Sequence, residues 1–360
     1  MEWVLPAARL QAASVPDFHI FYGVRPVPLS PVPADKPTLP EADGDLLQQL
    51  ESLQRLLRPT PVISLAFEGL DLNAKLEYQN PIGSVKDRSA LWVLKNAVME
   101  GRVHGGTTII ESSSGNFASA LAFYCRMLGL PFIPVIDPNI ASQYEAFLRQ
   151  TCSRVEKVSQ RDETGGFLQT RLDLVQALLE DIPDAYWTNQ YANPHNMDAH
   201  YMLTGKEICD SFKSLDYLFL GVSSGGTVAG ISRRVKEKWP NVKVIAVDAQ
   251  GSIIFGGPPK RRNIPGLGSS IIPPLVERAK IDEVEMVSER AAVHGCRTLL
   301  DRYGLFVGGS TGSVFSAIMH YAPRIQCPEN PKTVLFLCAD RGTAYLDTVF
   351  NPEWATRLEV

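Results

Sequence analysis

Long apolar runs are missing from this sequence of 360 residues. The longest, residues 215–222 and 333–340, are far shorter than the ~20 residues that a helix needs to cross a bilayer. A surplus of basic residues is missing too: Lys and Arg number 35 against 39 Asp and Glu, and the formal net charge is −4. We therefore expect no membrane span and no binding to nucleic acid.

Paired cysteines and metal-ligand spacings are also missing. None of the six cysteines forms a Cys-x-x-Cys pair, and several lie in apolar segments, which is typical of reduced, buried thiols in the cytoplasm. His195 and His200 lie five positions apart with no third ligand nearby, so we expect no metal site. The first residues lack a basic region followed by an apolar one, so we expect no signal peptide.

Several nucleotide-binding and hydrolase patterns are absent or incomplete. Neither Gly-x-Gly-x-x-Gly nor Gly-Lys-Ser/Thr occurs. The segments around Ser223 and Ser310 do fit Gly-x-Ser-x-Gly, the nucleophile elbow of hydrolases. After Ser310 the only histidine is His320, in the very next helix, which cannot fold back onto that elbow. Ser223 leaves Asp248 and His294 as formal partners, so a hydrolase stays open as a minor alternative.

What the sequence does contain is an alternation of short β-branched runs with longer helical patterns. Such alternation, with nearly continuous apolar strands, is typical of an α/β fold whose parallel sheets are covered by helices. Expected strands cover 107–111, 131–136, 153–159, 217–222, 242–248, 305–309 and 333–338. Expected helices cover 45–58, 117–129, 165–181, 227–239, 289–304 and 313–322. Proline-rich residues 24–44 predict an extended arm.

Lys86 stands in an unusual place, the first turn of an apolar helix. Ser84 and Asp87 form a capping box for that helix, and Gly101 ends it. The free N–H groups make a helix start partly positive, which disfavours a cation. This position and partial burial lower a lysine pKa and favour the free amine, a nucleophile that forms Schiff bases. A surface lysine that tolerates a poor position is the ordinary alternative.

Three loops that follow expected strands are rich in Gly and Ser: residues 111–117, 221–230 and 307–314. Each would aim backbone N–H groups of a helix start at an anion. The second loop suits a phosphate best, because it combines hydroxyl groups with glycines that permit close approach. Tight turns of an α/β fold explain one such loop comfortably, but three together poorly.

Lys86 and these loops together resemble the pyridoxal-phosphate-dependent β-replacement enzymes of fold type II, the cysteine synthase and cystathionine β-synthase group. The similar segments follow the family order over about residues 55–350. They are 75–90 (Schiff-base lysine), 111–122 (substrate carboxylate), 189–208 (a Gln segment), 221–230 (cofactor phosphate) and 307–314 (pyridine nitrogen). The resemblance implies a two-domain fold, each domain a mostly parallel sheet covered by helices. It implies an arm at 1–50, a smaller mobile domain at 80–190, and a larger cofactor domain at 51–79 plus 191–360.

The resemblance also implies a role for each site residue. Lys86 would hold pyridoxal 5'-phosphate and later move the Cα proton, Asn116 would bond the ring hydroxyl, and Ser310 would face the pyridine nitrogen. A neutral hydroxyl there leaves the ring a weaker electron sink, which suits elimination of a β leaving group. The cofactor phosphate would lie on Ser223, Ser224, Gly225, Gly226 and Thr227. The substrate carboxylate would lie on Ser113, Ser114, Gly115 and Gln190.

Three further segments, residues 165–175, 263–271 and 338–354, resemble the branch that makes a 2,3-diaminopropionate precursor. There, O-phospho-L-serine loses phosphate to form an aminoacrylate, and the L-glutamate amino group adds to give N-(2-amino-2-carboxyethyl)-L-glutamate. A leaving phosphate and a dicarboxylate call for arginine near the mouth of the site. Arg171, helped by Tyr191 and Ser224, is the main candidate. Arg261 and Arg262 are weaker candidates, and a solvated basic loop is their ordinary interpretation.

Two other functions stay open within the resemblance. The nucleophile would be sulfide or a thiol in a cysteine or cystathionine synthase. A non-catalytic relative would bind the cofactor without turnover, although Lys86, Asn116, Gln190 and Ser310 are all present. We expect small amino-acid substrates and, from the family, a homodimer.

Overall fold

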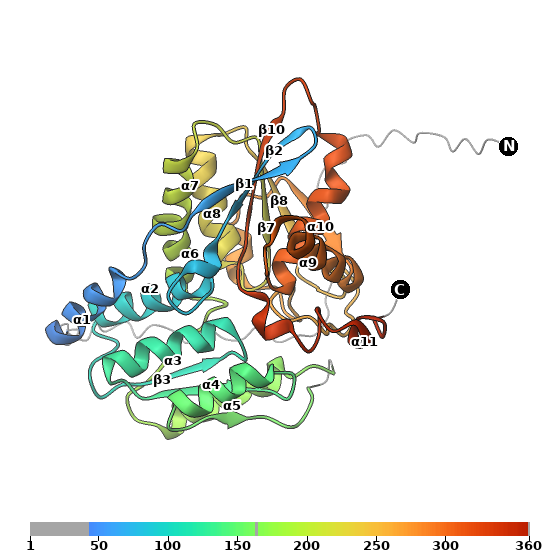
Figure 1. Cartoon of the computed structure of the whole chain (residues 1–360). Coiled ribbons are helices and arrows are strands. Elements are labelled where there is room, and N and C mark those ends of the chain that lie inside the picture. Colours follow the sequence, from blue (N-terminus) through green and yellow to red (C-terminus); the bar gives the residue numbers. More distant parts are fainter. Residues whose placement is uncertain (1–42, 163–164, 359–360) are drawn as a thin grey trace. The chain divides into compact units, whose positions relative to one another are not determined.

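A large mixed sheet organises the first of two layered parts in the computed structural model, which describes residues 43–162 and 165–358 (Figure 1). Its strand order is β1-β2-β10-β7-β8-β9. The strands are β1 (Val62–Phe67), β2 (Leu70–Lys75), β7 (Tyr217–Gly221), β8 (Lys243–Ala249), β9 (Glu283–Val287) and β10 (Lys332–Leu337). Only β1 and β2 pair antiparallel, and the other pairs are parallel.

A smaller sheet organises the second part and is parallel throughout. Its order is β5-β4-β3-β6, so that β3 (Thr108–Ser112) and β4 (Phe132–Ile136) are central, while β5 (Glu156–Lys157) and β6 (Ala185–Trp187) form the edges. All four strands fall within residues 80–190, the segment expected to form the smaller domain. The domain division itself stays a prediction.

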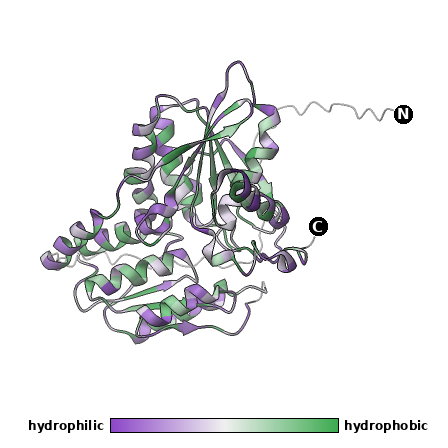
Figure 2. Ribbon diagram, viewed as in Figure 1, coloured by the Kyte–Doolittle hydropathy of each residue, from purple (hydrophilic) through white to green (hydrophobic). Residues whose placement is uncertain are grey.

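Helices cover both faces of each sheet, as an α/β fold requires. The helices of the described residues are α1 (Gly44–Gln54), α2 (Lys86–Met99), α3 (Asn116–Leu128), α4 (Ser142–Thr151), α5 (Leu168–Asp181), α6 (Pro194–Ala199), α7 (Gly205–Ser211), α8 (Gly226–Lys238), α9 (Glu289–Tyr303), α10 (Gly309–Tyr321) and α11 (Pro352–Ala355). In the large sheet, Phe219 packs toward α9 and α10, while its neighbour Leu220 packs toward α8. In the small sheet, Ile109 packs with α2 and α3, and Ile110 packs with α5. Figure 2 shows the apolar strands between helices whose outer faces are polar.

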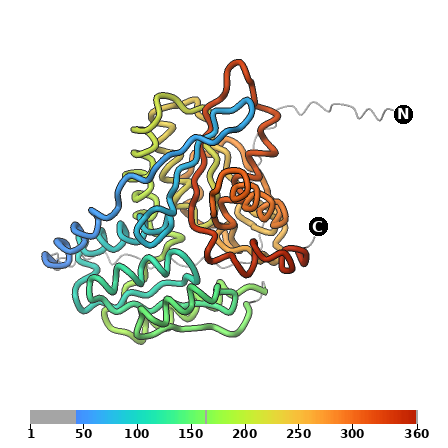
Figure 3. Tube along the Cα trace, in the orientation of Figure 1, coloured from blue at the N-terminus to red at the C-terminus, as the bar shows by residue number. Residues whose placement is uncertain are grey.

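Segments far apart in the sequence lie side by side in the large sheet. The β1–β2 hairpin, blue in Figure 3, runs beside β10, which is red and belongs to the last part of the chain. Ala74 pairs with Phe336, and Phe336 pairs on its other side with Phe219. This pairing brings the start of α2 close to the chain that follows β10, because Ser84 forms an isolated bridge with Asp340.

The α/β architecture predicted from the sequence is confirmed, with local corrections. The strand expected at 305–309 is absent: only Val307 forms a single bridge, to Arg341, because Gly309 already begins α10. The strand expected at 153–159 shrinks to the two residues of β5. The hairpin β1–β2 and the edge strands β6 and β9 were not foreseen. Strands β1, β6 and β9 are partly exposed, and polar residues interrupt the largely buried β2, so none of them has a long apolar run.

Three further expectations concern the proline-rich arm, the cysteines and membrane-spanning helices. The proline-rich arm lies, up to residue 42, outside the described residues, and α1 begins at Gly44. All six cysteines are unpaired. Across residues 43–162 and 165–358, every helix falls short of the length and apolar character required to cross a membrane.

Candidate active site

Lys86 is the first residue of α2, and its neighbours build a tight turn before it. The Ser84 hydroxyl accepts a hydrogen bond from the Lys86 N–H at 3.2 Å and donates one to Asp87 at 3.1 Å. The Asp87 carboxylate also accepts from the N–H groups of Ile82 and Gly83. The capping pair is therefore present, but Val85 rather than Ser84 is the residue at the cap, because Asp87 reaches back beyond Ser84 to the turn.

The Lys86 amine gives up its proton more readily than an ordinary lysine. Burial lowers its pKa from the ordinary value of 10.5 to about 8, and the Asp340 carboxylate opposes this only in part. Within the described residues its amine forms no hydrogen bond or ion pair. Such an amine is a better nucleophile at neutral pH than an ordinary lysine.

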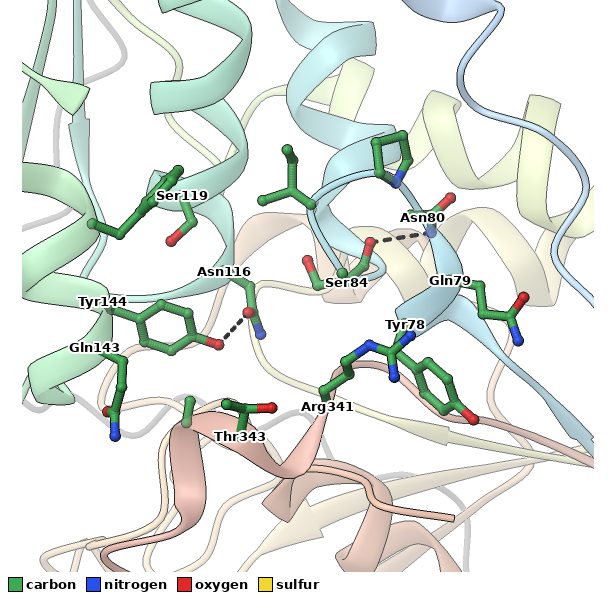
Figure 4. A pocket seen from close by; sticks show the side chains of 15 residues that line it. Tyr78, Gln79, Asn80, Ser84, Asn116, Ser119, Gln143, Tyr144, Arg341 and Thr343 are labelled. Carbon is green, nitrogen blue, oxygen red and sulfur yellow. Dashed lines mark hydrogen bonds between the residues drawn. The ribbon is translucent and has the colours of Figure 1, made fainter. Parts of the chain in front are cut away.

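Asp340 connects Lys86 to Asn116. The amide of Asn116 donates to Asp340 Oδ2 at 2.8 Å, and the Tyr345 hydroxyl donates to the same oxygen at 2.9 Å. The Tyr144 hydroxyl donates to Asn116 Oδ1 at 2.5 Å (Figure 4). Burial raises the pKa of Asp340, whose second oxygen, Oδ1, has no hydrogen-bond partner among the described residues.

The loop before α8 contains the residues expected to hold a phosphate. Gly225 adopts a left-handed φ of 88°, and a Cβ there would lie 2.8 Å from the backbone of Val276. A Cβ on Gly226 would lie 2.4 Å from the Asn196 side chain, so the loop needs glycine at both positions. The first turn of α8 presents N–H groups without intrahelical acceptors. These N–H groups and the Ser224 hydroxyl are the donors that an anion would meet here, while the Ser223 hydroxyl donates to Gly268 O at 3.2 Å.

A buried histidine supports the end of this loop. His200 lies in a π-helical turn, His200–Thr204, and its Nε2 is 3.2 Å from the Thr227 hydroxyl while Nδ1 is 3.0 Å from Thr204. Burial, with the positive charge of Lys86, lowers the pKa of His200 to about 3, so the ring is neutral. The influence of Lys86 on His200 shows that the lysine and the loop lie near one another.

Ser310 lies in the first turn of α10, beside the same cluster. A Cβ built on Gly266 would lie 3.6 Å from the Tyr345 hydroxyl and 3.9 Å from Ser310 Cβ. Tyr345 in turn bonds Asp340. Ser310 is therefore close to the Asp340 group, and its hydroxyl makes no bond to other described residues.

These residues fit pyridoxal phosphate. The site combines a free amine at Lys86 with a phosphate-sized loop at the start of α8 and an available hydroxyl at Ser310. Asn196 Oδ1, packed against Gly226, is buried without a partner in the described protein. The donor set matches the groups expected for the aldehyde, the phosphate and the ring of that cofactor.

The expected substrate-carboxylate residues meet at the end of β3. Gly115 caps α3, and Ser113 accepts a hydrogen bond from Ala118 N–H at 3.3 Å. Ser114 donates to Asp137 at 3.1 Å. Gln190 donates from Nε2 to Ser112 O at 3.3 Å and to Glu111 at 3.5 Å. Burial raises the pKa of Glu111 to about 7.

Arg171 reaches this loop from α5. Its Nη1 donates to the Ser114 hydroxyl at 3.2 Å, and its Nε lies 3.4 Å from Asp137. Tyr191 is close enough to both Arg171 and Arg262 for their charges to act on its pKa, which burial raises. Arg262 is anchored on Gly251 O and Ser270, whereas Arg261 is exposed. Arg171 is thus tied to the Ser114 loop by a hydrogen bond, whereas the link of Arg262 to Tyr191 is electrostatic.

The sequence interpretation missed Asp340, Tyr144, Tyr345 and His200 as members of the site. Asp340 and Tyr345 follow the last strand, in residues 338–354, which resembled the diaminopropionate branch but were given no role in the site. His200 was considered only as a metal ligand. Tyr144 had no signal in the sequence.

A buried lysine at a helix start, close to a glycine-rich loop that opens another helix, is the arrangement that a pyridoxal-phosphate enzyme needs. The model of the pyridoxal-phosphate-dependent enzyme family matches residues 53–340. The chain belongs to this family, and pyridoxal phosphate is its cofactor.

Curated relatives and solved structures agree with that family. An N-(2-amino-2-carboxyethyl)-L-glutamate synthase of Ralstonia nicotianae is 44% identical over 83% of this chain and 89% of its own. The enzyme of the same name from Cupriavidus metallidurans is 43% identical over 79% and 84%. The O-acetylserine-dependent cystathionine β-synthase of Helicobacter pylori superposes with a TM-score of 0.75 at 32% identity, covering 82% of this chain and 97% of that one. O-ureido-L-serine synthase gives 0.75 at 26% identity, covering 83% and 95%.

Proposed function

We propose that the chain converts O-phospho-L-serine and L-glutamate into N-(2-amino-2-carboxyethyl)-L-glutamate and phosphate. The substrate loses its Cα proton and then its β-phosphate. The amino nitrogen of glutamate next bonds to the β-carbon and loses a proton, and a proton returns to Cα. The names of the relatives at 44% and 43% identity support this reaction. The product supplies 2,3-diaminopropionate for secondary metabolism.

The observation that carries the choice of leaving group is the position of Arg171. Its guanidinium lies 3.2 Å from the hydroxyl of Ser114, in the loop expected to hold the substrate carboxylate. The charges of Arg171 and Arg262 both act on the hydroxyl of Tyr191. A guanidinium binds phosphate in bidentate fashion, which suits a phosphorylated serine better than an acetylated one.

The remaining residues divide the work of binding and proton transfer. Pyridoxal phosphate, when bound, supplies the electron sink for loss of a β-substituent. Lys86 holds it and moves the substrate Cα proton at Nζ, for which a pKa near 8 is suitable. Asn116 and Ser310 orient the ring, and residues Ser223–Thr227 bind its phosphate. Ser113, Ser114, Gly115 and Gln190 orient the substrate carboxylate.

The proposal also covers the cellular compartment and the oligomeric state. We infer a cytoplasmic enzyme, supported by six unpaired cysteines. We infer a homodimer from the family resemblance, which light scattering of the purified protein tests.

A competition assay tests the reaction. The holoenzyme is mixed with O-phospho-L-serine and equal L-glutamate and sulfide, and the products are identified by mass spectrometry. We expect the glutamate adduct. Cysteine as the only product would overturn the choice of nucleophile, and no product from either O-phospho-L-serine or O-acetyl-L-serine would overturn the substrate class.

A further inference from the structure

A pocket of about 530 Å³ lies beside Asn116, and the residues assigned above to cofactor and phosphoserine leave most of it unused. Four segments line it: the turn that precedes α2, the first turns of α3, the first turns of α4, and the chain just after β10. Figure 4 shows these segments facing one another around the cavity.

The pocket opens onto the reactive group. Ser84 and Asn116 line it, and both belong to the network around Lys86. Ser84 bonds the Lys86 N–H, and Asn116 bonds Asp340, which acts electrostatically on the Lys86 amine. A molecule in this pocket therefore lies next to the residues that surround Lys86.

The pocket has one charged lining residue, Arg341. The guanidinium of Arg341 lies over the Tyr78 ring at 4.7 Å from its centre, which fixes its orientation. Across residues 43–162 and 165–358, Arg341 forms no ion pair. The other polar lining groups, which include Gln79, Gln143 and Thr343, are neutral.

Arg341 is exposed at this pocket and has no carboxylate partner in residues 43–162 and 165–358, so its guanidinium is available to an anion that enters. The phosphoserine side of the site has a different character, because Arg171 is already paired with Asp137 there. The two arginines therefore lie in separate surroundings, one for each substrate.

We propose that this pocket binds the amino-acid nucleophile, and that Arg341 pairs with its side-chain carboxylate. The inference rests on the proposed function and adds the place and the specificity of the second substrate. The amine of the nucleophile lies at the Ser84–Asn116 end and its distal carboxylate at Arg341. An acidic amino acid is selected over its neutral amide because the amide leaves Arg341 without a partner.

Steady-state kinetics of Arg341→Gln tests this assignment, with Arg302→Gln as the matched control. Arg302 is an exposed arginine in the last turn of α9 and lies outside the pocket. We expect Arg341→Gln to raise the KM for L-glutamate about 10- to 100-fold, the range for a lost charge-assisted hydrogen bond. The kcat at saturating glutamate and the KM for O-phospho-L-serine change little. Arg341→Lys recovers part of the loss, and Arg302→Gln behaves as wild type.

Discrimination against L-glutamine is the second kinetic readout. Wild type prefers L-glutamate, and Arg341→Gln loses that preference. An unchanged KM and unchanged preference in Arg341→Gln would overturn the proposal. A wild-type enzyme that makes no glutamate adduct would instead refute the proposed function.

Calorimetric titration of the holoenzyme with glutarate tests the pocket without turnover. Glutarate has two carboxylates and no amine, so it binds without reacting. We expect binding to wild type and to Arg302→Gln, and loss of it in Arg341→Gln. Equal binding by all three would overturn the role of Arg341 whatever the product of the reaction.

Discussion

Two cations lie two residues apart on α2, in opposite surroundings. Arg88 is fully buried and saturated: it bonds Glu77 at 2.7 Å and Glu207 at 2.5 Å. Lys75, also fully buried, bonds Glu207 at 2.7 Å. Burial alone would raise the pKa of Glu77, yet Arg88 and Lys75 lower it to about 2.

Lys86 has the opposite character. Burial lowers its pKa to about 8, and burial raises the pKa of Asp340, the carboxylate whose charge acts on it. The first turn of α2 therefore contributes both to the support of the fold, through Arg88, and to the site, through Lys86. A completed ion network ties α2 to β2 and α7, and this fixed support holds an incompletely paired amine at the site.

Removing the reactive amine has the largest expected effect. Lys86→Ala should lower turnover at least ~10³-fold, because both cofactor attachment and proton transfer at Cα are lost. Phosphate release from O-phospho-L-serine measures it, and far-UV circular dichroism confirms the fold. The control is Lys206→Ala, an exposed lysine of α7. Wild-type activity in Lys86→Ala would refute the account of the site.

Breaking the buried ion network around Arg88 should lower the stability of the fold rather than remove the reactive amine. Arg88→Met leaves Glu77 and Glu207 with one cation between them, which costs about 3–5 kcal/mol of unfolding free energy. Urea unfolding followed by fluorescence measures this loss. A change below about 1 kcal/mol would mean that the network does not support α2.

Removing Arg171 should separate the two possible leaving groups. Arg171→Gln should raise the KM for O-phospho-L-serine by about 10-fold or more and change that for O-acetyl-L-serine little, because only phosphate gains bidentate pairing. Initial rates with each substrate provide the comparison. Equal losses with both would show that Arg171 supports the Ser114 loop rather than the phosphate.

The rate at which the apoenzyme binds pyridoxal phosphate should depend on pH in a way that distinguishes Lys86 from an ordinary lysine. Only the free amine attacks an aldehyde, so the rate at which apoenzyme captures pyridoxal phosphate should rise with pH and level off above about 8. Stopped-flow absorbance measures it. A rate that continues to rise toward pH 10 would contradict the lowered pKa of Lys86.

Asp340→Asn should have the smallest effect. The Asp340 carboxylate raises the pKa of Lys86 and so partly offsets burial. Its neutralisation should move the midpoint of cofactor capture to lower pH, while the introduced amide keeps one oxygen as an acceptor for Asn116 and Tyr345. The same stopped-flow series measures the shift, and a midpoint that moves upward would contradict the assigned electrostatics.

Sequence patterns predicted those parts of the enzyme whose structure depends on residues close together in the chain. The apolar strands β3, β4, β7, β8 and β10 were predicted from continuous hydrophobic runs. Lys86 was predicted because a cation is unfavourable at an ordinary helix start. The glycine-rich loop at Ser223–Thr227 was predicted because the backbone N–H groups of a helix start suit an anion.

What the sequence did not predict depends on distant partners. Asn116 and Asp340 are 224 residues apart, and their hydrogen bond joins the start of α3, which follows the small sheet's β3, to the chain after β10 of the large sheet. Tyr144 reaches Asn116 from α4, and no pattern along the chain indicates this. The strand expected at 305–309 was wrong because the helix start at Gly309 outweighs the short apolar run before it.

Borohydride reduction of the holoenzyme tests the central claim most directly. The reagent fixes pyridoxal phosphate covalently to the amine that holds it, and peptide mass mapping then locates the label. The account predicts one labelled lysine, Lys86, whereas buried Lys75 stays unlabelled because Glu207 and the Thr60 carbonyl bond its ammonium. A label on Lys75 or on a surface lysine, with Lys86 unmodified, would contradict the account.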